Sequence, residues 1–74
     1  VNNTNHTNIT TFYNNGYINI LGEADYIEIF STEGKKLLSQ HLTTSTIPTS
    51  LEKGIYIVTL YNNNQKTTNK LIIK

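Results

Sequence analysis

The chain has 74 residues, a mass of 8.4 kDa and a formal net charge of +1, which leaves room for one small domain. It contains no Cys, Trp, Met or Arg, so it has neither disulfides nor thiolate metal sites, and it lacks the usual bidentate reader of phosphate and guanine. No apolar run approaches the ~20 residues of a membrane-spanning helix. These features argue against nucleic acid as a partner and against a membrane span. They favour a module of a longer chain over a small cytosolic protein.

Residues 1–8 read VNNTNHTN and are almost entirely polar. Such a segment buries too little apolar surface to offset the cost of ordering its backbone, roughly 1–2 kcal/mol per residue. We therefore predict a polar linker from an upstream domain over residues 1–8 and a folded domain over residues 9–74.

From residue 9 onward, short runs rich in β-branched and aromatic residues alternate with turn residues. The runs cover residues 9–13, 17–21, 26–30, 36–42, 55–61 and 66–73. Asn15-Gly16 predicts a type I′ hairpin turn, because both central positions of that turn need positive φ. Residues 43–50 contain Pro48, which has no N–H, and therefore form an edge strand or a connection. The pattern predicts an all-β fold, a small Ig-like antiparallel β-sandwich of six to seven short strands.

The run at residues 55–61 reads IYIVTLY and is apolar on both faces. Tyr56 and Val58 share one face, while Ile55 and Ile57 share the other. The run therefore predicts a central strand that is packed on both sides. On this interpretation, replacing Ile57 by Ala should cost about 2–5 kcal/mol.

The titratable side chains do not form a recognisable catalytic or metal-binding motif. The candidates are His6, His41, Glu23, Asp25, Glu28, Glu33 and Glu52. Glu23 and Asp25 flank a turn, where capping is the ordinary role of such residues, and two acids are too few for a calcium site. Neither a nucleophile motif nor a glycine-rich phosphate loop is present. We expect a domain that is not an enzyme and that needs neither a metal nor another cofactor.

Three segments stand in a recognisable order and spacing. They are residues 26–35 (YIEIFSTEGK), residues 51–58 (LEKGIYIV) and residues 70–74 (KLIIK). Together they resemble the type A C-terminal sorting domain of the type IX secretion system of Bacteroidota. The pattern of that family is an apolar strand closing on a Gly-Lys turn, a Leu-x-x-Gly-x-Tyr-x-Val strand and a last strand ending in Lys. Residues 1–8 lack the Pro-Asn-Pro-type motif that many members carry before the first strands.

This resemblance implies a seven-stranded Ig-like sandwich at the end of a secreted cargo protein, which can itself be an enzyme such as a protease. The domain would be a non-catalytic signal that directs the cargo from the periplasm through the outer membrane. Its partners would be the type IX translocon and shuttle proteins, and then a cell-surface sortase that removes it. The cargo would end at the cell surface or outside the cell.

The resemblance also assigns recognition by the translocon or the sortase to residues in the three segments. These are Gly34, Lys35, Gly54, Tyr56, Lys70, Leu71, Ile72, Ile73 and Lys74. The expected cleavage region is Asn2, Asn3, Thr4 and Asn5. From the residues themselves, Gly34 and Gly54 suit reversals or positive φ. If the last strand lies at an edge, its unpaired backbone is a template for strand addition by a receptor, with charge contacts from two lysines. The same edge could pair or exchange with a second copy to form a homodimer.

Two rival interpretations come from other functional classes. One is an Ig-like or fibronectin-like accessory module that binds carbohydrate or spaces the domains of a surface protein. In that case Tyr13, Tyr17 and Tyr61 would stack on sugar rings. The other is a small sandwich that inhibits a peptidase or acts like a chaperone.

Overall fold

A computed structural model describes residues 9–74. They form seven strands and no helix, so none of them belongs to a helix that could cross a membrane. The strands are β1 (Thr10–Asn14), β2 (Tyr17–Leu21), β3 (Tyr26–Ser31), β4 (Lys36–His41), β5 (Thr46–Pro48), β6 (Gly54–Asn62) and β7 (Gln65–Ile73). The predicted linker at residues 1–8, with His6 and the expected cleavage region at residues 2–5, lies outside the described residues.

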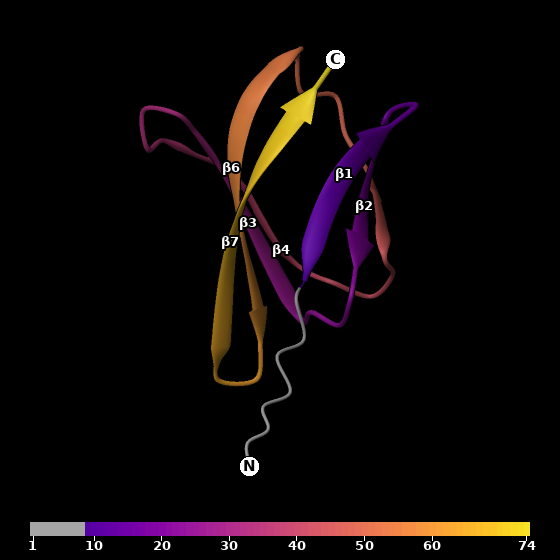
Figure 1. Cartoon of the computed structure of the whole chain (residues 1–74), viewed down its shortest axis with the longest axis vertical. Coiled ribbons are helices and arrows are strands. Elements are labelled where there is room, and N and C mark those ends of the chain that lie inside the picture. The colour runs from indigo at the N-terminus through magenta and orange to yellow at the C-terminus, as the bar shows by residue number, and fades with distance from the viewer. Residues whose placement is uncertain (1–8) are drawn as a thin grey trace.

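The strands form two antiparallel sheets that pack face to face (Figure 1). The smaller sheet has the order β1-β2-β5 and the larger sheet the order β4-β3-β6-β7. The chain changes sheet after β2, after β4 and again after β5, so each sheet combines segments that are distant in sequence. The predicted all-β sandwich is confirmed, with the larger of the two expected strand numbers.

The core lies between the two sheets and is built from aliphatic side chains alone. On β3, for example, Ile27 and Ile29 are fully buried, while Tyr26 and Glu28 point to the opposite face. This alternation follows from the two-residue repeat of a strand. The buried cluster consists of Ile9, Ile18, Ile20, Ile27, Ile29, Ile47, Val58, Leu60, Leu71 and Ile73.

The local turn and edge predictions are confirmed. Asn15 and Gly16 have φ values of 50° and 86°, the two positive values that a type I′ turn needs between β1 and β2. Pro48 ends β5, a three-residue strand at the edge of the smaller sheet. The missing N–H of this proline therefore costs no hydrogen bond in the interior of the sheet.

Strand β6 is central, as predicted, because it lies between β3 and β7. The expectation that both of its faces are packed is wrong. Val58 and Leu60 are fully buried on the inner face, whereas Ile55 is 50% exposed on the outer face and Ile57 is only half-buried. Nothing in residues 9–74 covers this outer face of the larger sheet, since the smaller sheet packs on the other side.

Strand β7 lies at an edge of the larger sheet, where β1 of the smaller sheet packs beside it. The Asn69 side-chain amide donates a hydrogen bond to the carbonyl oxygen of Ile9 across this seam, at 2.8 Å. Within residues 9–74, the backbone of β7 pairs only with β6. The last strand thus has the edge position that strand addition requires, although β1 flanks part of that edge.

The two faces of β6 should respond differently to truncation. We expect Leu60→Ala to lower the free energy of unfolding by about 2–5 kcal/mol, because it leaves a cavity in the core. Ile55→Ala should cost about 1 kcal/mol or less, since half of that side chain is already in water and only strand propensity and partial packing are lost. Urea unfolding followed by circular dichroism measures both. If Leu60→Ala does not fold, Leu60→Val and Ile55→Val provide a milder pair on the same strand, and equal costs within either pair would contradict the assignment of faces.

Candidate functional site

The three segments that carry the family resemblance meet at one end of the larger sheet. Gly54 lies opposite Ile73, and Tyr56 lies opposite both Leu71 and Ser31. Ser31 is also the point from which the turn between β3 and β4 starts. In Figure 1 the C-terminus and the start of β6 stand side by side at the top of the molecule. We call this region the C-terminal end of the larger sheet: residues 31–35, residues 54–56 and residues 70–74.

The turn in this region is held by Ser31. Its hydroxyl oxygen accepts hydrogen bonds from the backbone N–H groups of Glu33 and Lys35, each at 3.2 Å. Its own N–H donates to the carbonyl of Lys35 at 2.8 Å. Gly34 has a φ of 92°, so the predicted need for positive φ is confirmed there. The turn presents Lys35 as an exposed side chain.

Tyr56 anchors the connection that enters β6. Its hydroxyl donates a hydrogen bond to the carbonyl oxygen of Glu52 at 2.6 Å, while its ring packs against the core. A tyrosine that bonds the backbone a few residues upstream at a sandwich corner is a known device of immunoglobulin-like folds. Gly54 lies between the two with a φ of 155°. Tyr56 therefore acts as a structural residue of the C-terminal end of the larger sheet.

The last strand alternates between buried and exposed side chains. Leu71 and Ile73 belong to the core, while Lys70, Ile72 and Lys74 are exposed. The nine residues implied by the resemblance therefore divide into two groups. Gly34, Gly54, Tyr56, Leu71 and Ile73 shape or support this end, and Lys35, Lys70, Ile72 and Lys74 are available for contact.

A shallow groove adjoins the same end, between the edges of the two sheets. Its volume is about 570 Å³, and it is lined by Tyr13, Leu51, Glu52, Lys53, Ile73 and Lys74. The groove therefore combines apolar walls with charged side chains of both signs and lies directly beside the end of β7.

A hydrogen-bonded group on the outer face of the larger sheet was not foreseen from the sequence. The Tyr61 hydroxyl donates to Oε1 of Glu28 at 2.8 Å, and Lys36 Nζ lies 3.2 Å from Oε2. The bond from Tyr61, and then that from Lys36, lower the pKa of Glu28 below its ordinary value of 4.5. The same bond raises the pKa of Tyr61 above 10.0. Only the pairing register brings these residues together.

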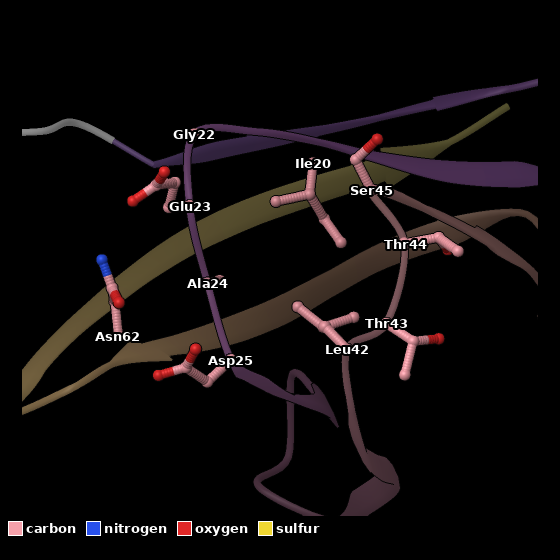
Figure 2. A pocket seen from close by; sticks show the side chains of 10 residues that line it. All are labelled: Ile20, Gly22, Glu23, Ala24, Asp25, Leu42, Thr43, Thr44, Ser45 and Asn62. Atoms are coloured by element: carbon pink, nitrogen blue, oxygen red, sulfur yellow. The ribbon is translucent and has the colours of Figure 1, made fainter.

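A second hollow, of about 370 Å³, lies at the opposite end of the molecule (Figure 2). It contains Glu23 and Asp25, the two acids that flank the predicted turn. The Asp25 carboxylate accepts a hydrogen bond from the N–H of Asn63 at 3.1 Å, and the backbone N–H of Asp25 donates to the Tyr61 carbonyl at 2.7 Å. Asp25 thus caps the distant turn between β6 and β7, whereas the sequence predicted a capping role in its own turn.

The other titratable candidates lie apart from one another. His41 is exposed at the end of β4, and its ring meets the edge of Tyr26 with 5.0 Å between centroids. Glu33 and Glu52 lie near the C-terminal end of the larger sheet, far along the strands from Asp25. Among residues 9–74, no group of three or more His, Cys, Asp or Glu side chains could hold a metal ion.

The three tyrosines of the carbohydrate-binding interpretation lie on three different surfaces. Tyr13 packs against the core, Tyr17 is exposed on the smaller sheet, and Tyr61 lies on the outer face of the larger sheet. They therefore do not form a shared platform on which sugar rings could stack.

Comparison with known proteins identifies one family. The model of the secretion system C-terminal sorting domain matches residues 3–74. The match includes all three segments that meet at the C-terminal end of the larger sheet, and it begins within the predicted linker. No curated protein matches the chain.

The hydrogen bond of Tyr56 can be tested without changing the shape of the core. We expect Tyr56→Phe to lower the free energy of unfolding by about 0.5–1.5 kcal/mol, because the carbonyl of Glu52 loses its partner. Tyr17→Phe is the matched control, since that side chain is exposed on the smaller sheet. Equal urea midpoints for Tyr56→Phe and the parent would show that the corner contributes nothing to stability.

The group around Glu28 should make stability depend on pH in the acid range. A carboxyl whose pKa is lowered by folding contributes stability above its unfolded pKa, and this contribution is lost as the pH falls through the folded pKa. We therefore expect Glu28→Gln to be less stable than the parent near pH 7, and the difference to shrink near pH 3. Urea unfolding at both pH values measures it, with Glu33→Gln as a control in an exposed turn. A difference that stays constant with pH would contradict the role of the carboxylate.

Proposed function

The chain belongs to the secretion system C-terminal sorting domain family, and from this premise we propose that it is the export signal of a cargo of the type IX secretion system. The cargo is carried to the cell surface or the extracellular space. The domain itself is non-catalytic and acts by protein–protein recognition. Its partners are the translocon and shuttle proteins of that system and the cargo in the same chain.

The observation that best supports this proposal is the convergence of the three family segments on one end of one sheet. Segments that are distant in sequence, such as residues 31–35 and residues 70–74, come to lie at the same end of the sheet through the order β4-β3-β6-β7. A stable sandwich does not require this end to carry exposed lysines. An accessible surface made from three separate segments is what a receptor needs to recognise a folded signal rather than a short peptide.

We assign the receptor contacts to the exposed members of that end, Lys35, Lys70, Ile72 and Lys74. Strand β1 runs beside the C-terminal half of β7, from the contact between Ile9 and Asn69 to the groove that Tyr13 and Ile73 line, so we assign recognition at this end to side chains and not to strand addition. The lysines add charge contacts, which favour fast association and a fixed register.

After export, we propose that a cell-surface sortase removes the domain by cleavage in or before residues 2–5. The polar sequence of residues 1–8 suits this step, because a peptidase cleaves where it can bind several residues in an extended conformation. Transit of the cargo through the periplasm belongs to the same proposal.

A reporter with its own signal peptide, fused to residues 1–74 in a host with the type IX machinery, tests the export signal. We expect the fusion to reach the cell surface or the medium, while the reporter alone stays in the periplasm. Lys35→Ser combined with Lys74→Ser should lower the export rate roughly tenfold, as the loss of about 1.4 kcal/mol of binding would. Lys53→Ser with Lys66→Ser is the control, because it removes the same charge from positions outside the assigned contacts. Retention of the unmodified fusion in the periplasm would refute the proposed function.

Intact-mass analysis of the exported reporter tests the cleavage step. We expect a product that ends in or before residues 2–5 and lacks residues 9–74. An exported reporter that keeps the whole chain would refute removal by a sortase and leave the export signal itself intact.

A further inference from the structure

The outer face of the larger sheet carries a block of four apolar side chains. In the pairing register Phe30 lies opposite Ile57, and Ile55 lies opposite Ile72, so the four residues occupy adjacent positions on β3, β6 and β7. Ile55 is 50% exposed and Ile72 is 49% exposed, while Phe30 and Ile57 are half-buried. We call Phe30, Ile55, Ile57 and Ile72 the outer apolar patch.

Lysines stand around this patch. Lys36 pairs in register with Phe30 on one side, and Lys70 pairs with Ile57 on the other. Lys74 follows directly after the end of β7 and lines the groove beside Ile73. The acid nearest to the patch on this face is Glu28, whose carboxylate is already bonded to Tyr61 and Lys36. Because Glu28 and Lys36 compensate each other's charge, the positive charge left beside the patch is that of Lys70, with Lys74 just beyond the end of the strand.

The patch departs from the pattern of a solvated sheet. An antiparallel sheet that faces water on one side normally carries polar residues there. The other half of this face follows that rule, with Glu28, Ser39, Thr59 and Thr68 aligned across the four strands. A contiguous exposed apolar patch with a polar rim marks an interaction site on a soluble protein.

We propose that the outer apolar patch binds a protein surface whose apolar centre is flanked by carboxylates. The inference rests on the proposed function in one respect: it places this partner among the proteins of the secretion system. Charge selects the partner: carboxylates would pair with Lys70 and Lys74 while the apolar centres exclude water between them.

Other occupants fit the patch less well. A second copy docked through the same face would bring lysines against lysines, because a two-fold interface places the same patch on both sides. A lipid surface requires apolar groups that sink about 5–10 Å into the headgroup boundary, whereas Phe30 and Ile57 are half-buried and Ile55 and Ile72 are only about half exposed. Residues 1–8 contain a single aliphatic residue, Val1, and would cover the patch poorly.

The test compares the two outer faces of the sandwich. Ile55→Thr with Ile72→Thr makes the patch polar while keeping β-branched residues that suit a strand. The control is Phe12→Thr with Leu21→Thr on the outer face of the smaller sheet, where the two side chains are 44% and 56% exposed. Thermal unfolding followed by circular dichroism first confirms that both variants fold like the parent.

Each variant is then fused to the reporter and its export is measured. We expect the patch variant to be exported roughly tenfold more slowly and the control within about twofold of the parent. Lys70→Glu should slow export as well, because it repels the carboxylates of the partner. Export of the patch variant at the parental rate would overturn this inference and leave the proposed function standing. Retention of the unmodified fusion would overturn both.

Two measurements on the purified domain address the other occupants. Sedimentation with vesicles of phosphatidylcholine and phosphatidylglycerol that the patch variant abolishes would overturn the inference in favour of a membrane. A monomer–dimer equilibrium in analytical ultracentrifugation that the patch variant abolishes would overturn it in favour of a second copy. If the domain is monomeric and does not sediment with the vesicles, these results support a protein partner with acidic groups.

Discussion

The fold depends on the burial of one face of strand β6. This strand pairs with β7 over its whole length and with β3 over most of it, so it joins two parts of the chain that would otherwise not meet. Its inner side chains, Val58 and Leu60, are fully buried against the rest of the core. A domain of this size buries only about 60% of its unfolded surface, and without disulfides it cannot spare such a face.

The same strand places the candidate site. Because β6 begins at Gly54 and β7 ends at Ile73 directly opposite, the last residues of the chain lie beside the corner that Tyr56 closes. On β7, residues that pack into the core alternate with exposed residues that are available to a receptor. A substitution at Leu71 therefore affects stability, because this residue belongs to the core, whereas a substitution at Ile72 affects the surface.

Charge on the larger sheet is arranged unevenly. Glu28 is bonded by Tyr61 and Lys36 at the polar half of the outer face, which leaves Lys70 and Lys74 beside the apolar half. The polar half forms its hydrogen bonds within the domain, whereas the apolar half has lysines beside it, so the two halves of this face are chemically different. A partner that matches both features can dock in only one orientation.

Local propensity and the two-residue repeat were enough to predict the strands, the Asn15-Gly16 turn, the edge position of Pro48 and the aliphatic core. The residues of the three family segments were also identified from the sequence. Three features came from the folded arrangement: these segments share one end, Tyr61 bonds to Glu28, and Ile55 and the half-buried Ile57 lie on the outer face. The physical reason is that sheet order and register depend on contacts between residues far apart in the chain. An apolar strand has the same local pattern whether a second layer covers one of its faces or both.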